Sequence, residues 1–142
     1  MKQAWARHIP EAVLAAAALA AWCLMRGWEV PADVGWQLWV ARQLLGGTRL
    51  YAEIWEVNPP LWFWSAMPFA WRAERTGMAA SAVLTGAVLA FGAVCAGLVG
   101  RLLETRTHPE RLAVMRLAFA VTLALPAALR GQREHLALIA SL

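Results

Sequence analysis

The sequence predicts an all-α integral membrane protein with about four transmembrane helices and two short interfacial helices. Three observations support this fold class. Hydrophobic residues make up 61% of the 142 residues and charged residues only 15%, whereas soluble domains average about 45–50% and about 25%. The apolar residues fall in runs close to the roughly 20 residues that a helix needs to cross a bilayer. The chain also contains nine Trp, a residue enriched at membrane–water boundaries.

The first predicted span covers residues 9–28, where an Ala/Leu-rich run follows Lys2 and Arg7. At about 1.5 Å per residue, such a helix matches the thickness of the hydrocarbon core. A basic start followed by an apolar run is also typical of a signal peptide. However, Trp22 is too bulky to precede a lipoprotein processing site at Cys23, so we expect a retained signal-anchor helix.

A second span is predicted over residues 77–100, which carry no charge. Small residues recur every four positions in two stripes, and such stripes let helices approach closely in lipid. The stripes consist of Ala82, Gly86 and Ala90, and of Gly92, Ala96 and Gly100. We therefore expect this helix to be the span that is most enclosed by protein.

Two further spans are predicted over residues 112–129 and 135–142. The last has only eight residues, whereas a crossing helix needs about 20. We therefore expect the chain to be the amino-terminal part of a larger membrane protein, packed against further transmembrane helices.

Six of the nine Trp lie between the first two spans. This stretch predicts two short helices, over 33–45 and 59–72, the first of them ended by Gly46-Gly47. Asn58 is placed to cap the second helix, and a proline follows it at the first helical position. Both helices are short for a crossing, and the Trp density favours helices that lie in the membrane interface.

The positive-inside tendency orients this arrangement. With both short helices lying flat, the amino-terminal tail and the 101–111 loop share one side, and the density of basic residues there makes that side cytoplasmic. Asp33 and Glu134 then lie together at the opposite, extracytoplasmic face. We expect a multi-pass protein of the cell inner (plasma) membrane.

The run 32–47, followed by Leu50-Tyr51 and by Glu56-Val57-Asn58-Pro59-Pro60-Leu61, resembles the first extracytoplasmic loop of GT-C glycosyltransferases. The similar enzymes are the protein mannosyltransferases and lipid A aminoarabinose transferases (family 39-like). They place an acidic residue after the first span and a Pro-Pro-Leu-like segment before a second surface helix. Their second acidic residue follows the third span, as Glu134 does in segment 130–136.

This resemblance implies transfer of a sugar from a polyprenyl-phosphate donor to an acceptor hydroxyl on the extracytoplasmic side of a bacterial inner membrane. Asp33 and Glu134 would be the catalytic residues, because a carboxylate at the membrane surface can act as general base. An arginine would stabilise the leaving phosphate. The substrate-binding residues would be Glu56, Asn58, Arg133 and His135. Partners would be membrane lipid and the polyprenyl-phosphate-linked sugar; no metal ligand is assigned, and the role of a divalent cation stays open.

The chain departs from the family pattern at three positions. Val34 stands where family members often have Glu, Asn58 where many have Lys, and Glu134 where Asp is common. Structural interpretations also compete with the functional ones. Asp33 could be a helix N-cap, Glu134 a solvated charge at a helix start, and the residues at 56 and 58 could be cap and loop residues.

The alternative function is a small non-enzymatic helical membrane subunit that binds a partner through its glycine-rich helix faces. A transporter fragment fits less well, because the predicted spans lack charges at mid-membrane. A nucleic-acid binder is excluded despite the net charge of +4, because the basic residues are spread between the apolar runs rather than gathered on one face.

Overall fold

The computed structural model describes residues 9–27, 29–102, 107–124, 137 and 139–141. Within these ranges every regular element is a helix, apart from one isolated bridge between Leu50 and Ile54. The all-α prediction is therefore confirmed. The helices are α2 (Ile9–Met25), α3 (Ala32–Leu45), α4 (Pro60–Trp64), α5 (Met67–Thr76), α6 (Ala80–Leu102) and α7 (His108–Ala124).

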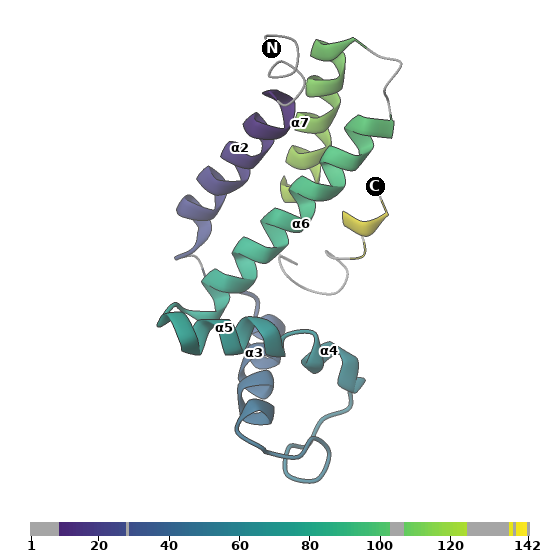
Figure 1. Ribbon diagram of the computed structural model, residues 1–142. Coiled ribbons are helices and arrows are strands. Elements are labelled where there is room, and N and C mark those ends of the chain that lie inside the picture. The colour runs from purple at the N-terminus through teal and green to yellow at the C-terminus, as the bar shows by residue number, and fades with distance from the viewer. Residues whose placement is uncertain (1–8, 28, 103–106, 125–136, 138, 142) are drawn as a thin grey trace.

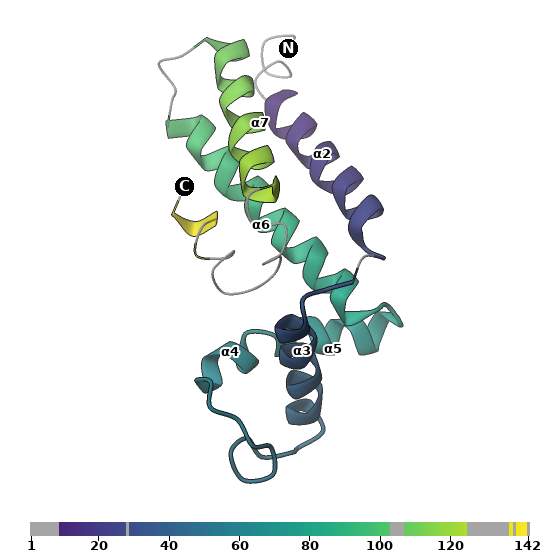
Figure 2. The same cartoon turned by 180° about the vertical axis from the view of Figure 1, so that it is seen from behind.

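These helices form two parts (Figure 1). The bundle consists of α2, α6 and α7, and the lobe consists of α3, α4, α5 and the loop 46–59. Both α2 and α7 pack on α6 and run in the opposite direction to it, as Figure 2 shows from behind. The lobe lies at the end of the bundle where α2 ends and α6 begins, so Arg101 and Arg111 lie at the other end.

The core of the bundle is apolar and is built by all three of its helices. Leu14 of α2, Leu89 and Ala96 of α6, and Met115 and Phe119 of α7 form one buried cluster. These side chains hold α6 between its two neighbours. Because α6 also contacts α3 and α5, it is the central helix of the part of the chain that the structure describes.

One of the two small-residue stripes on α6 is a complete packing face. Gly92, Ala96 and Gly100 are all buried. At Gly100 a Cβ atom would lie 2.3 Å from Cγ of Met115, so α7 approaches α6 more closely there than any side chain on residue 100 permits. The absence of a side chain therefore sets the helix separation at this crossing.

The other stripe packs through two of its three residues. Ala82 is buried, and its carbonyl oxygen accepts a hydrogen bond of 2.8 Å from Nε1 of Trp22. A Cβ at Gly86 would meet the same indole at 3.0 Å. Ala90, however, is exposed. In this stripe, Ala82 and Gly86 therefore contact the Trp22 ring of α2, and Ala90 does not take part in the packing.

Among the described residues, α6 is the one helix long and apolar enough to cross a membrane, by length and composition. The apolar part of α2, Ala12–Met25, is shorter. The α6 boundaries differ slightly from the predicted 77–100, because Gly77 adopts a left-handed conformation (φ 69°) that ends α5. Glycine takes this conformation without the steric cost of a side chain.

The predicted third crossing begins earlier than residue 112, because α7 starts at His108. A carboxylate oxygen of Glu110 accepts a hydrogen bond of 3.0 Å from the backbone N–H of Thr107. The spacing Thr-x-x-Glu is that of a capping box, which satisfies backbone donors at a helix start. Residues 125–129, and most of the predicted span 135–142, lie outside the described residues.

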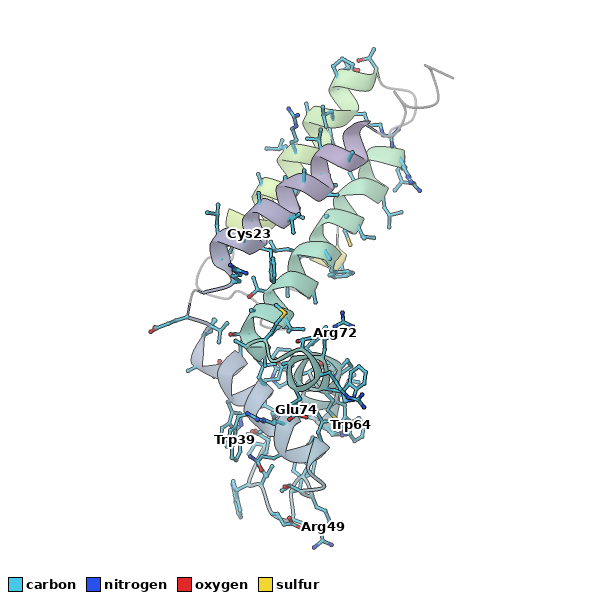
Figure 3. The ribbon with its side chains drawn as sticks, turned by 60° about the vertical axis from the view of Figure 1, so that its left-hand side comes forward. Cys23, Trp39, Arg49, Trp64, Arg72 and Glu74 are labelled. Atoms are coloured by element: carbon cyan, nitrogen blue, oxygen red, sulfur yellow. The ribbon has the colours of Figure 1, made fainter. Side chains whose placement is uncertain are left out.

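Helix α3 ends as predicted, with Gly46 as its C-cap and Gly47 at φ 92°. It is covered on two sides. One face packs with α5 and α6 through Val34 and Leu38, and another packs on Ile54 and Phe63 through Val40. In Figures 1 and 3 α3 extends away from the bundle while α5 lies across it.

The prediction of one helix over 59–72 is wrong, because α4 and α5 are separate. Pro68 has no N–H to donate to the carbonyl of Trp64, four residues earlier, so the helical hydrogen bonding is interrupted between them. The predicted cap is also wrong. Pro59 is the N-cap of α4, with Pro60 as its first residue, and Asn58 makes other hydrogen bonds.

Candidate functional site

Asp33 lies in the first turn of α3 and is exposed. The N-cap of this helix is Pro31, whose carbonyl accepts hydrogen bonds from the N–H groups of Val34 (2.9 Å) and Gly35 (3.0 Å). The interpretation of Asp33 as the N-cap is therefore wrong. An acidic residue in the first turn still gains from the helix dipole.

The packing of its neighbour places Asp33 at the junction of lobe and bundle. Val34 is fully buried in a cluster that includes Leu84 and Val88 of α6. The first turn of α3 is therefore held against the first half of the membrane-length helix. An exposed carboxylate here stands where an apolar bundle gives way to a polar, Trp-rich lobe.

The carboxylate of Glu56 accepts the hydrogen bonds that hold the loop before α4 in its conformation. Its Oε1 atom accepts from the backbone N–H groups of Val57 (2.7 Å) and Asn58 (2.9 Å) and from Nδ2 of Asn58 (2.9 Å). Its Oε2 atom accepts from the indole N–H of Trp36. Glu56 and Asn58 are thus brought together directly, and both are committed to the loop.

Trp36 attaches this loop to α3. It lies three residues after Asp33, about one helical turn further along the same helix. The structure therefore places Glu56 against Trp36, 20 residues earlier in the sequence. The spacing of Asp33 and Trp36 was visible in the sequence, but nothing there paired Trp36 with Glu56.

Hydrogen bonding lowers the pKa of Glu56 below its ordinary value of 4.5, with the bond from Trp36 as the largest cause. Partial burial acts in the opposite direction, and the donors of Val57 and Asn58 add to the lowering. Four hydrogen-bond donors around one carboxylate stabilise its ionised form and make it a poor proton acceptor. Glu56 is therefore suited to shaping the loop or to holding a hydroxyl rather than to accepting a proton.

A first prediction concerns this anion. Because the pKa of Glu56 is lower in the folded chain than in the unfolded one, its hydrogen bonds stabilise the loop fully above about pH 4.5 and are lost as the pH falls through the folded value. Replacing Trp36 with Phe removes the strongest donor and should raise the pKa of Glu56. The measurement is a carboxyl ¹³C NMR titration of Glu56; an unchanged titration in Trp36→Phe would contradict the assignment.

Tyr51 closes the same loop from its other end. Its hydroxyl donates a hydrogen bond of 2.6 Å to the carbonyl of Asn58. Its backbone lies at φ 67°, an uncommon conformation for a bulky residue. The strained residue and the Glu56 network together fix the loop 51–58, and sequence reasoning missed the part played by Tyr51.

Gln37 is a second residue that sequence reasoning missed. Its side chain is only 3% exposed, and its Nε2 atom donates to the carbonyl of Trp62 at 2.6 Å and to Oγ of Ser65 at 3.4 Å. These bonds attach α4 to α3 one turn beyond Asp33. An amide between apolar residues of α3 was the available signal.

The lobe also exposes aromatic surface. Trp36 and Trp39 stack with ring centroids 4.8 Å apart and planes 20° apart. Figure 3 shows Trp39 and Trp64 on opposite sides of the lobe, and Trp55 is 94% exposed. Exposed indoles on several sides suit an aromatic belt at a membrane surface, and the stacked pair offers a flat apolar face.

Two ion pairs lie in the lobe. Arg42 of α3 and Glu74 of α5, the latter labelled in Figure 3, form an ion pair of 3.2 Å. Arg49 and Glu53 form another, of 2.8 Å. Both pairs are solvent-exposed and contribute little stability, so they serve mainly to orient α5 on α3 and to brace the loop.

Three predicted site residues, Glu134, Arg133 and His135, lie outside the described residues. In the ranges that the structure covers, no group of three or more His, Cys, Asp or Glu side chains is placed to hold a metal ion. The described residues present one exposed carboxylate in the first turn of α3, at Asp33, and a loop organised around the Glu56 carboxylate. Comparison of the chain with family models, with curated proteins and with solved structures found no match.

Proposed function

We propose that this chain is the amino-terminal part of a GT-C-type membrane glycosyltransferase, which moves a sugar from a polyprenyl-phosphate donor to an acceptor hydroxyl at the extracytoplasmic surface. One observation carries the proposal: an exposed carboxylate, Asp33, stands where a Trp-rich lobe meets an apolar helix of membrane-spanning length. A lipid-linked sugar presents its reacting atoms at this kind of boundary.

The exposure of apolar surface supports a place in the membrane. Only 33% of the residues in the apolar window of α6 are buried within the chain, whereas the core helix of a soluble protein is mostly buried. Leu24 of α2, Leu98 of α6 and Leu117 of α7 are each more than half exposed, at 74%, 53% and 66%. Large apolar patches of this kind mark a surface that something other than water covers, and a bilayer covers all three helices at once.

The chemistry divides naturally between the groups at the site. The carboxylate of Asp33 would accept the proton of the acceptor hydroxyl as its oxygen bonds to the anomeric carbon of the sugar. The bond from that carbon to the phosphate oxygen then breaks, and the polyprenyl phosphate leaves. Trp36 and Trp39 offer a stacking face for a sugar ring, and the Glu56 loop shapes the side facing Asp33. Arg133 would neutralise the leaving phosphate.

The contacts of α6 favour this function over an interaction subunit. Its glycine-rich faces are already used within the chain, since Gly86 receives Trp22 and Gly100 receives Met115. A partner that binds through those faces must first displace α2 or α7. The proposed enzymatic function requires neither helix to be displaced.

The proposal predicts that Asp33 and Glu134 face the same side of the membrane. Ile139 is buried in one cluster with Val34, the residue after Asp33.

Cysteine labelling measures this topology. In a background with both native cysteines replaced, Asp33→Cys and Glu134→Cys should each react with a membrane-impermeant maleimide added to intact spheroplasts. Arg101→Cys, at the far end of the bundle, should react only after the membrane is opened. Reaction of only one of the two acid positions from outside would overturn the shared face.

Activity is tested with the full-length protein in membrane vesicles, supplied with labelled polyprenyl-phosphate sugars. Label should pass to an acceptor in vesicles that contain the protein and not in matched vesicles that lack it. Absence of transfer from a panel of such donors and acceptors, with the protein present and folded, would contradict the proposed function.

A further inference from the structure

A groove of about 280 Å³ lies between α2 and α6, in the half of the bundle away from the lobe. Its lining is apolar except at one end, where it reaches Arg101 in the last turn of α6. The apolar lining residues come from both helices and are Leu14, Ala15, Ala93, Val94, Gly97 and Leu98.

The groove exists because small residues form its floor. Ala15 and Ala93 carry only a methyl group, and a Cβ at Gly97 would find Leu14 no closer than 4.0 Å. The rims are larger side chains that stay exposed, with Val94 at 60% and Leu98 at 53%. The groove is therefore open to the surface, has apolar walls and runs along α6.

The length and ends of the groove define what fits. From residue 93 to residue 101 the axis of α6 rises by about 12 Å, which accommodates part of an extended hydrocarbon chain. The Arg101 end is cationic, and Arg111 lies near it, because its Cγ would be 3.5 Å from a Cβ at Gly100. The guanidinium group is planar and binds phosphate oxygens in pairs.

We propose that this groove binds one acyl chain of an anionic phospholipid, with the headgroup phosphate at Arg101. Basic pockets between transmembrane helices on the cytoplasmic side are the places where anionic headgroups bind. The site lies at the opposite end of the bundle from Asp33, so the bound lipid is not the sugar donor. The inference rests on the bundle being in a membrane, and it is independent of sugar transfer.

Native mass spectrometry of the full chain in detergent tests the site with two lipids of identical acyl chains, phosphatidylglycerol and phosphatidylcholine. Phosphatidylglycerol should bind about fivefold more tightly, the effect of one cation near a membrane surface. Arg101→Gln should reduce its affinity to that of phosphatidylcholine. Arg72→Gln, which removes an exposed cation from the lobe, should leave both affinities unchanged.

Filling the groove should remove both lipids. Gly97→Leu places a side chain where the acyl chain lies, and Gly97→Ala is the matched control that should keep binding. Should Gly97→Leu fail to fold by circular dichroism, Leu98→Gln makes the rim polar and should weaken both lipids.

Three results would overturn the proposal. The first is equal affinity for the two lipids in the unaltered chain. The second is a phosphatidylglycerol preference that survives Arg101→Gln. The third is displacement of the lipid by glycerol phosphate alone, which would make the site a simple anion site with no acyl groove.

Discussion

Replacing Asp33 with Asn in the full-length protein is expected to lower the rate of sugar transfer by about 10²–10⁴-fold, the usual contribution of a general base. Asn keeps the shape of the side chain and removes its negative charge and its basicity. Because Asp33 is exposed and is not the N-cap residue of α3, the substitution should leave folding and membrane insertion intact. The measurement is transfer from a polyprenyl-phosphate sugar in membranes, with the amount of protein quantified alongside.

The matched control for charge loss is Glu29→Gln. Glu29 is also exposed and lies four residues before Asp33, between α2 and α3. If the negative charge of this region were all that mattered, the two variants would lose activity equally. Near-normal transfer by Asp33→Asn would withdraw the catalytic assignment and leave this carboxylate as a first-turn charge only.

The largest expected effect on stability comes from Gly100→Ala. The new Cβ would lie 2.3 Å from Cγ and 2.5 Å from Sδ of Met115, and Met115 is fully buried, so its side chain has little room to move aside. Overpacking of this kind typically costs about 1–3 kcal/mol. We expect a lower melting temperature of the detergent-solubilised protein and a weaker contact between α6 and α7.

Gly97→Ala is the control within the same helix. Its Cβ would meet Leu14 at 4.0 Å, an ordinary contact, so the melting temperature should stay the same or rise slightly through improved helix propensity. A double-mutant cycle then isolates the clash. In a Met115→Ala background, Gly100→Ala should cost little, because the space is already open. Equal destabilisation by Gly100→Ala in both backgrounds would refute close packing at this crossing.

Much of the local structure followed from the sequence. Gly46-Gly47 ends α3 because Gly47 takes a positive φ, and apolar runs of sufficient length give helices α2 and α6. The stripe of Gly92, Ala96 and Gly100 became a helix contact, since close approach needs small side chains. These signals are local: they depend on composition and spacing within one or two helical turns.

Two other local signals were present in the sequence, but competing interactions decided the structure at those positions. Asn58 is a good cap by residue type, yet Glu56 takes its amide and Pro59 becomes the cap of α4. Pro68 was visible within the predicted helix 59–72, and its missing N–H divided that helix in two. In each case a competing bond or a missing donor decided between two structures that the residue types allow.

What the sequence determined by itself was therefore the helical class, one small-residue packing face and the end of α3, because hydrogen bonds and steric limits within a turn decide them. The tertiary structure alone decided that Trp36 reaches Glu56, that Gln37 ties α3 to α4, and that α3 extends away from the bundle. These features join residues 20 to 28 positions apart or require two faces of one helix to be buried at once. Side-chain donors have many acceptors within reach of the chain, and only the packing of apolar clusters on both sides of α3 selects which pair meets.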